Sequence, residues 1–497
     1  MDHTEALPDK VLLSIFSYLI EVPSILPLSA REPGVAVLEV CRRWHRVILD
    51  ILTYKWRNVI SPTISSNRFN AKIKYDQCWL FLHIQRHGGH WLNIHLFLTT
   101  PPALNADIGN PSSDELDVLE NVIFPAATRV KCLSLLFSSH RAAASFLTTP
   151  TRFYFLESIE LRFLNDSQSG VAGTAANAMK FSRPITVFQN LCSLRYVSIR
   201  IHNGLNPLAL HLPWYQLTRI HMGFSIISPR VFMTILSKSS PSISIAFFTV
   251  KFSPKLRSPS SYANQTRWPK VFAPALEHLH LRLINPSFDS DIFTGVHLPA
   301  LISFQLDLYD SNAGWMLDIY YPLLYSSSNT LRAIAFFNLE GSEGPGRLAN
   351  HRGGPGRNSS EVSEDMEHLF SILPMVRVLE LPLGLYISET AMELISVGRL
   401  LPSLEALQVT SLIGVDILTM VKNRNEVANL LSGLVGSSST LPTTRCNSQR
   451  YSPHHPSKVV LCTSARARVE SFMANIRSLS SMQNTEFRID YADQSLF

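Results

Sequence analysis

The first sixty residues place apolar side chains at helical spacing in two separate runs. The first run follows Pro8, and the second begins at Val37 after an interval that contains several prolines. Proline is tolerated in a first helical turn, and apolar residues three or four positions apart cover one helical face. The pattern predicts two amphipathic helices in an N-terminal module, residues 1–61. The apolar stripes comprise Val11, Leu12, Ile15, Phe16 and Leu19, and then Val37, Val40, Cys41, Trp44, Val47, Ile48, Ile51 and Leu52.

A second pattern, Leu-x-x-Leu-x-Leu with hydrophobic substitutes, recurs from Trp91 to Leu404. Because successive side chains of a strand point to opposite faces, each copy predicts a short strand with one buried face, and stacked copies predict a curved solenoid. Helical spacing from Val415 to Leu434 predicts a helix that caps this array. The copies begin at Trp91, Val130, Leu156, Leu194, Leu217, Leu276, Leu301, Leu331, Val376 and Leu404, with a poorer copy near Ile243.

The two patterns together predict an α/β chain in which a small helical module precedes an irregular leucine-rich-repeat solenoid. We expect a connecting segment and helix at 62–90, the solenoid at 91–435, and a basic, Ser-rich linker with a weak C-terminal helix at 436–497. Two insertions in the solenoid, near 253–270 and 341–365, are rich in Ser, Pro, Gly or Arg. Such compositions favour disordered loops.

The N-terminal module combines Leu7-Pro8 with Cys41-Arg42-Arg43-Trp44 and a closing Trp56 and Ile60. This set resembles the F-box, and in particular the F-box-like modules abundant in mushroom-forming fungi. The resemblance implies that the helical face docks onto a Skp-type adaptor, which joins a cullin scaffold and a ubiquitin-conjugating enzyme. Trp44 and Trp56 are assigned to the module's own core, because large aromatic side chains dominate burial in small domains. By position, the implied adaptor contacts are Leu7, Pro8, Val11, Leu12, Ile15 and Phe16.

The side chains between the repeated leucines face outward and form the natural surface for a client protein. Arg162, Arg200, Arg282 and Asp307 come from four repeats, and parallel stacking would place them in one strip at about 4.8 Å per strand step. Three of the four are cationic, which predicts an acidic or phosphorylated client segment held by arginine forks. The alternative is that these arginines lie over apolar sheet surface and only solubilise it.

Composition and charge argue against a disordered chain and against a nucleic-acid-binding protein. With 46% hydrophobic and 16% charged residues among 497, the chain cannot be disordered throughout. The net charge is 44 − 38 = +6, and residues 436–480 hold six basic side chains against one acid, so the rest is nearly neutral. Charge scattered along a Ser-rich tail argues against a nucleic-acid partner.

Cellular location is predicted from the cysteines and the N-terminus. The six cysteines are far apart and form no CxxC pair, which fits thiols in a reducing compartment. The start, MDHTEALPDK, lacks the features of a secretory signal, and prolines interrupt the longest apolar run near it. We expect an intracellular protein, cytoplasmic or nuclear, with no membrane partner.

Two short motifs have the spacing of a catalytic or metal site but lack residues that the chemistry requires. Gly341–Leu348 has the glycine spacing of a phosphate-binding loop but lacks its lysine and its hydroxyl. His83 and His87 have a spacing that could present imidazoles to a structural zinc, yet no glutamate lies between them to activate a metal-bound water. We expect no enzyme, no catalytic residues, no cofactor and no metal.

These inferences predict a substrate-recognition subunit of an SCF-type cullin ubiquitin ligase, which binds its adaptor through the module and a client through the repeats. The alternative is a leucine-rich-repeat interaction scaffold with no ubiquitin link, in which the N-terminal helices only cap the solenoid. A nucleic-acid-associated protein that uses the basic tail is a third, weaker hypothesis.

Overall fold

The computed structural model describes twenty-one segments of the chain, which divides into two compact units, 1–226 (unit 1) and 227–497 (unit 2). The described residues are 7–19, 24–25, 43–44, 47, 58–60, 92–98, 119–137, 140–149, 153–163, 185, 187–188, 191–201, 206–252, 268–285, 291–309, 317–337, 366–381, 387–410, 414–437, 458–463 and 486–491.

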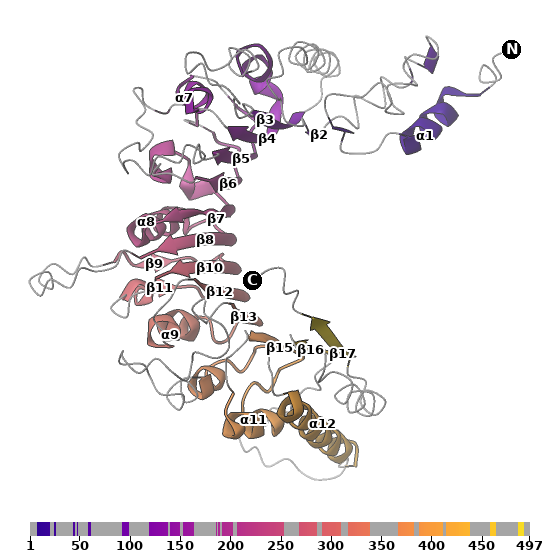
Figure 1. Cartoon of the computed structure of the whole chain (residues 1–497), viewed down its shortest axis with the longest axis vertical. Coiled ribbons are helices and arrows are strands. Elements are labelled where there is room, and N and C mark those ends of the chain that lie inside the picture. Colours follow the sequence, from indigo (N-terminus) through magenta and orange to yellow (C-terminus); the bar gives the residue numbers. More distant parts are fainter. Residues whose placement is uncertain are drawn as a thin grey trace, which may run out of the picture. The chain divides into compact units, whose positions relative to one another are not determined.

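Unit 1 is built on strands that pair in parallel and in chain order (Figure 1). The strands are β1 (Ser24–Ile25), β2 (Asn58–Ile60), β3 (Leu92–Leu98), β4 (Val130–Phe137), β5 (Ser158–Phe163), β6 (Tyr196–Arg200) and β7 (Arg219–Ile227). The helical elements are α1 (Asp9–Leu19), η1 (Leu119–Ile123), α6 (Phe124–Ala126), η2 (Ala127–Arg129), α7 (His140–Thr148), η3 (Pro207–Leu210) and η4 (Trp214–Gln216).

Unit 2 repeats this arrangement, again with parallel pairing. Its main strands, in order, are β8 (Ile245–Lys251), β10 (His278–Ile284), β12 (Ser303–Tyr309), β13 (Ala333–Phe337), β14 (Val378–Leu381), β15 (Ala406–Thr410), β16 (Lys458–Thr463) and β17 (Glu486–Tyr491). A small second sheet joins β9 (Val271–Phe272) to β11 (Val296–His297). The helical elements are α8 (Pro229–Ser239), η6 (Asp291–Phe293), α9 (Leu317–Ser326), α11 (Glu389–Ser396) and α12 (Gly414–Ser437).

The repeated sequence pattern accounts for the strands. From the copy at Leu156 onward, each strand begins two residues after the first apolar residue of the pattern. That leading residue is buried and lies two positions before the strand. The next two pattern residues are buried within the strand, as Leu279 and Leu281 are in β10. The parallel strands expected from the pattern are therefore confirmed. The buried leading residues are Leu156, Leu194, Leu217, Ile243, Leu276, Leu301, Leu331, Val376 and Leu404.

The backbone repeats as regularly as the side chains. In β10, β12, β13, β14 and β15 the amide before the strand donates to the equivalent carbonyl of the preceding copy, for example Glu277 N to Ser244 O at 2.9 Å and Ile302 N to Glu277 O at 2.8 Å. Leu279, Phe304 and Ile334 consequently lie in register across three strands. Each strand thus places its apolar residues over those of its neighbour and builds one continuous buried row.

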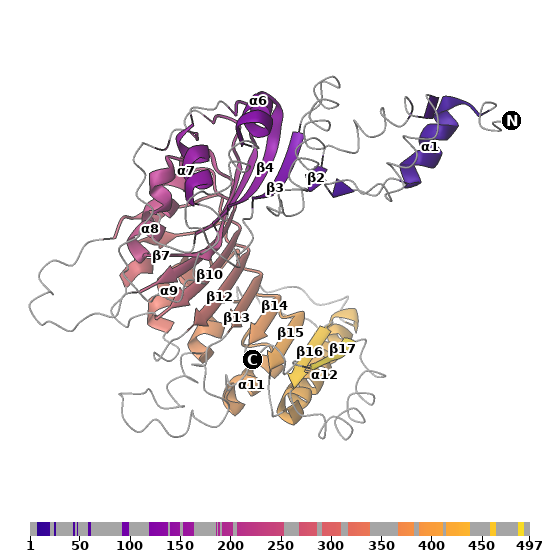
Figure 2. The ribbon, with the colours of Figure 1, turned by 45° about the horizontal axis from the view of Figure 1, so that its top comes forward.

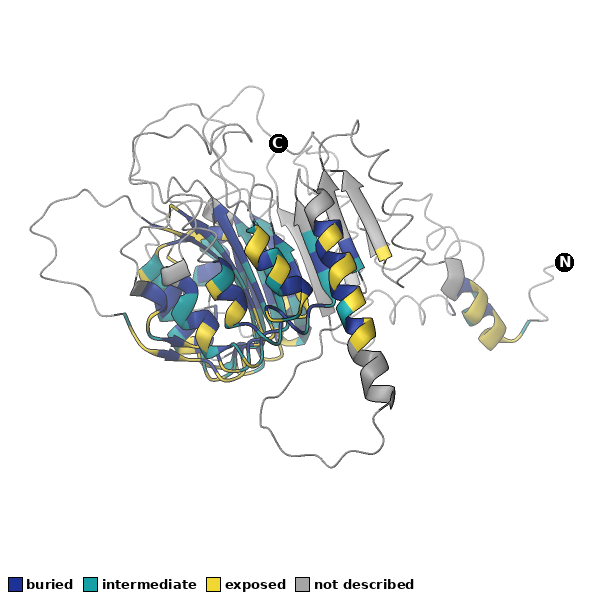
Figure 3. Ribbon diagram, turned by 90° about the horizontal axis from the view of Figure 1, so that it is seen from below, coloured by how far each residue is buried: buried dark blue, intermediate teal, exposed yellow. Residues whose placement is uncertain are grey.

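Helices cover the buried side of the unit 2 strands, as Figures 2 and 3 show. In α8, Phe232 packs against Phe248 of β8 with ring centroids 5.1 Å apart. In α9, Tyr320 packs against Phe293 at 5.8 Å. The opposite face of these strands carries the side chains between the pattern residues, which are mostly polar in β10 and β12, mixed in β8 and apolar in β13.

Several expectations from the sequence need correction. Residues 458–463, expected in a linker, form β16, which pairs with β15, and 486–491 form β17 beyond it. The repeated pattern does not detect these two strands, because Pro456 and Asn484 occupy the position where the leading apolar residue is expected. Within the module, expected to be wholly helical, β1 and β2 pair in parallel, consistent with the strand preference of β-branched Val59 and Ile60.

Of the remaining expected elements, one is confirmed and the others lie outside the described residues. The helix predicted from Val415 to Leu434 is confirmed as α12. The expected helix in 62–90, most of both insertions (253–267 and 341–365) and the weak helix near 466–480 lie outside the described residues.

A conservative substitution tests the buried row. Ile334→Val removes one methylene from a side chain that is 1% exposed, and we expect unit 2 to lose about 0.5 to 1.5 kcal/mol of stability. Ile302→Val, at a position that is 39% exposed, is the matched control and should change stability by less than about 0.5 kcal/mol. Hydrogen exchange of the β12 and β13 amides measures both, and equal losses would mean that the register of these strands is misassigned.

Candidate protein-interaction sites

The apolar residues of α1 lie on two adjacent edges with different environments. Leu12 and Phe16 are each 1% exposed, whereas Val11 is 40% and Ile15 is 44% exposed. Each pair is four residues apart and therefore one turn apart on its own edge. One edge thus packs inside the module while the other presents two branched side chains outward.

The inward edge packs on the second predicted helix, whose residues Arg43, Trp44 and Val47 have helical backbone conformation. The Phe16 and Trp44 rings lie 4.8 Å apart between centroids, a distance typical of favourable aromatic pairs. Trp44 is half-buried and packs on the inner edge of α1, which agrees with its expected place inside the module. Trp56 lies outside the described residues.

The beginning of α1 is held by Arg43. Its Nε donates to Asp9 Oδ1 at 2.9 Å, its Nη2 donates to the same oxygen at 2.7 Å, and Nη2 also donates to the Leu7 carbonyl. The helix itself begins with the Val11 amide donating to the Pro8 carbonyl at 2.9 Å. Arg43 and Trp44 together fix α1 at its first turn and at its middle.

Loss of Arg43 should loosen α1 more than loss of Asp9. An exposed ion pair contributes about 0 to 1 kcal/mol, and a hydrogen bond from a charged donor contributes about 1.5 kcal/mol or more. Because Arg43→Met removes both contacts, we expect the α1 amides to exchange about tenfold faster with solvent. Asp9→Asn keeps the bond to the Leu7 carbonyl and should have a smaller effect. Equal effects of the two variants would show that the carbonyl contact contributes nothing.

The six implied adaptor contacts therefore differ in accessibility. Pro8, Val11 and Ile15 are exposed and Leu7 is half-buried, so these four can meet a partner directly. Leu12 and Phe16 face the module interior. Of the six residues, the structure thus leaves Leu7, Pro8, Val11 and Ile15 accessible, at the start of α1 and along its outward edge.

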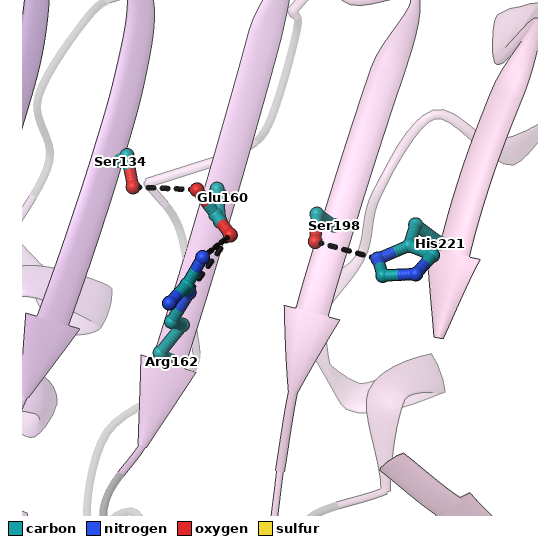
Figure 4. A network of polar contacts seen from close by, with 5 residues as sticks. All are labelled: Ser134, Glu160, Arg162, Ser198 and His221. Carbon is teal, nitrogen blue, oxygen red and sulfur yellow. Dashed lines mark hydrogen bonds and ion pairs between the residues drawn. The ribbon is translucent and has the colours of Figure 1, made fainter. Parts of the chain in front are cut away.

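A second candidate site lies on the polar face of the unit 1 sheet, over strands β4 to β7. Ser134, Glu160, Ser198 and His221 are Cα partners of one another across these four strands and form one polar row. Ser134 Oγ donates to Glu160 Oε2 at 2.7 Å, and Ser198 Oγ lies 3.2 Å from His221 Nδ1 (Figure 4). The row is thus linked by side-chain hydrogen bonds in two pairs.

Two arginines stand beside this row. Arg162 and Arg200 are Cα partners on β5 and β6. Arg162 donates from Nε and Nη2 to Glu160 Oε1 at 2.8 and 2.5 Å, while the Arg200 guanidinium lies 5.1 Å from the centroid of the Phe224 ring. Burial lowers the pKa of His221, with Glu160 acting to raise it and Arg162 to lower it further. His221 is therefore neutral at physiological pH and joins the row as a hydrogen-bonding group.

The end of β7 reverses the expected alternation. Strict alternation from Ile220 and Met222 would bury Phe224 and Ile226, yet these are 51% and 57% exposed, and Ser225 is 1% exposed. Ser225 Oγ donates to the Ile199 carbonyl at 2.6 Å and accepts from the Ile201 amide at 2.8 Å. The Ser225 hydroxyl thus bonds the backbone at the end of β6 in place of a main-chain group of β7. Two large apolar side chains consequently lie on the outward face next to Arg200.

The four residues proposed from sequence as client contacts form two in-register pairs, one in each unit. Arg162 pairs with Arg200 in unit 1, and Arg282 pairs with Asp307 in unit 2. Arg282 Nε donates to Asp307 Oδ2 at 2.6 Å, and the Asp307 side chain is 5% exposed. The unit 2 pair is therefore internally neutralised.

Within the described ranges, no group of three or more His, Cys, Asp or Glu side chains is arranged to hold a metal ion. His83, His87 and Gly341–Leu348 lie outside those ranges. Among the helices of the described segments, none is long and apolar enough to span a bilayer.

Comparison with known proteins identifies the N-terminal module. The F-box-like family matches residues 4–60, a span that contains α1, Arg43 and Trp44 and ends at the last residue of β2. The chain has no significant match among curated proteins. The F-box-like domain expected from the sequence is thereby confirmed for this span.

Proposed function

We propose that this protein is the substrate-recognition subunit of an SCF-type cullin ubiquitin ligase. F-box domains in general bind Skp-type adaptors, and residues 4–60 match the F-box-like family. The observation that carries the proposal is the outward edge of α1, where Val11 and Ile15 are exposed on a helix that Arg43 and Trp44 hold in place. Exposed branched side chains on a rigid helix provide the preformed apolar contact that helix-mediated docking requires.

The parallel strands of both units are proposed to form a leucine-rich-repeat solenoid that holds the client. The recurring backbone bonds and the in-register apolar residues of unit 2 support this proposal, because repeat arrays stack equivalent residues of successive copies. The polar faces of the strands supply the binding surface. The proposed partners are thus a Skp-type adaptor, a cullin scaffold and a client protein, with neither nucleic acid nor membrane among them.

Catalysis in this proposal belongs to the partners, so the chain is not an enzyme and needs no cofactor. Holding the client beside a loaded ubiquitin-conjugating enzyme makes a bimolecular transfer effectively intramolecular, and this proximity is the contribution of a receptor. The proposal places the protein inside the cell, in the cytoplasm or nucleus. The free thiols of Cys132 and Cys192 are consistent with a reducing compartment.

The test uses the purified full chain and a recombinant Skp-type adaptor. We expect the two to co-elute in size-exclusion chromatography, and addition of the cullin should yield a ternary complex. A folded chain that never co-elutes with the adaptor would refute the proposal and favour the alternative, a leucine-rich-repeat scaffold with no ubiquitin link.

A further inference from the structure

The outward face of β5, β6 and β7 carries an excess of positive charge. These strands contain Arg162, Arg200 and Arg219 against Glu160, so their net charge is 3 − 1 = +2. Arg162 and Arg200 are Cα partners, and Glu160 offsets one of these two charges through its ion pair with Arg162. The excess positive charge that remains on the face attracts an anionic group.

Apolar surface lies directly beside Arg200. Phe224 and Ile226 are exposed on β7 because Ser225 is bonded inward, and the Arg200 guanidinium lies over the Phe224 ring. The Arg200 guanidinium keeps its positive charge while it stacks on the ring, because this contact uses only its flat face. The face therefore offers a cationic point and an apolar point next to each other.

The spacing of these two points matches an extended peptide. Neighbouring strands are about 4.8 Å apart, so a group midway between β5 and β6 is about one and a half steps, or roughly 7 Å, from β7. Residues i and i+2 of an extended chain lie on the same side about 6.8 Å apart. An acidic residue above Arg162 and Arg200 thus places the side chain two positions away over Phe224.

We propose that this face binds an extended acidic segment of a client protein, in which Asp or Glu is two residues from an aromatic or aliphatic residue. The inference deepens the proposed function and rests on it, since it states the chemistry of the client. The Arg162 and Arg200 pair keeps a net positive charge beside Glu160 and is therefore the proposed binding pair, whereas Arg282 and Asp307 neutralise each other.

The first experiment identifies the preferred peptide without assuming its sequence. An array of immobilised random nonapeptides is probed with the purified full chain in the absence of adaptor. We expect enrichment of acidic residues two positions from Phe, Tyr, Trp, Leu or Ile. Absence of that enrichment, or selection of basic peptides, overturns the inference.

The second experiment locates binding on the chain. The best-selected peptide is labelled, and its affinity is measured by fluorescence anisotropy. We expect at least a tenfold loss of affinity for Arg162→Gln with Arg200→Gln, for Phe224→Ser, and for a peptide whose acidic residue is replaced by Lys. Arg200→Gln alone preserves the Arg162 to Glu160 ion pair and should still lose severalfold.

Matched controls exclude general effects of charge and hydrophobicity. Arg230→Gln with Lys238→Gln removes two exposed cations from α8, and Tyr215→Ser removes an exposed aromatic ring from η4. These variants should bind within twofold of wild type. If Arg200→Gln and Phe224→Ser retain wild-type melting temperatures and wild-type affinity, the face is not the binding site.

The adaptor assay distinguishes this failure from failure of the proposed function. A chain that binds the adaptor but selects no acidic peptide refutes only the inference. A chain that selects the peptide but never binds the adaptor refutes the ubiquitin-ligase role while leaving the peptide site in place.

Discussion

Val11→Asp combined with Ile15→Asp is expected to abolish co-elution of the chain with a Skp-type adaptor. Both side chains lie on the outer edge of α1, and each aspartate would place a charge in an apolar contact. A central contact residue commonly contributes about 2 kcal/mol or more to binding, which corresponds to about 30-fold in affinity for each position. Size-exclusion chromatography with purified components measures the loss directly.

The fold of the module should survive this change, because Leu12 and Phe16 keep their contacts on the inner edge. The helical circular dichroism and the exchange rates of the α1 amides should therefore stay close to wild type. Tyr325→Asp with Leu430→Asp, at two exposed apolar positions of unit 2, is the matched control and should leave co-elution intact. If the α1 variant still co-elutes at the wild-type level, the outer edge is not the docking surface.

Arg424→Met is expected to destabilise the region around α11, α12 and β15 by about 3 to 5 kcal/mol. Arg424 is fully buried and donates to the carbonyls of Ile395, Leu401 and Pro402 at 2.6, 3.0 and 2.8 Å. Burial lowers the pKa of Arg424 to about 10, so the guanidinium remains charged at neutral pH. Methionine fills part of the volume but cannot donate to any of the three carbonyls.

The bonded turn also has a strained backbone. Leu401 has φ 46°, in the left-handed region that is unfavourable for a branched residue, and it is fully buried. Arg424 stabilises that conformation by binding the Leu401 carbonyl, so its loss should also release the turn. Hydrogen exchange of residues 387–410 reports on this effect.

Lys422→Met provides the control on the same helix. Lys422 is exposed and its contact with Glu426 is 4.0 Å long, so the change should cost less than about 0.5 kcal/mol. Comparable increases in exchange for the two variants would show that the buried guanidinium does not hold the turn.

The positions of most strands could be predicted from the sequence because one short apolar pattern determines them locally. Leu276, Leu279 and Leu281 each have the environment that their position in the pattern predicts. The pattern fails where its leading leucine is replaced, and for that reason β16 and β17 were not expected. In both strands the partner strand supplies the register that the missing residue would have indicated.

Other features depend on tertiary contacts that periodicity does not contain. Phe224 and Ile226 continue an alternating apolar pattern, and only the bonds of Ser225 to β6 turn them outward. Arg424 occupies an apolar helical stripe with Val421 and Ala428, where a charged residue signals burial only once its carbonyl partners are known. The division of α1 into two edges likewise requires knowledge of Trp44.

The direct pairing of strands that are distant in sequence has a consequence for how such a chain can change in length. Twenty-three residues separate β12 from β13 (333 − 309 − 1), and forty separate β13 from β14 (378 − 337 − 1), yet both pairs are parallel and in register. Closing the longer connection costs only about 0.5 kcal/mol more in chain entropy. Extra sequence can therefore accumulate before residue 366 almost without penalty to the sheet, whereas an insertion among Met366, Leu369 and Phe370, which are buried, would disturb the core.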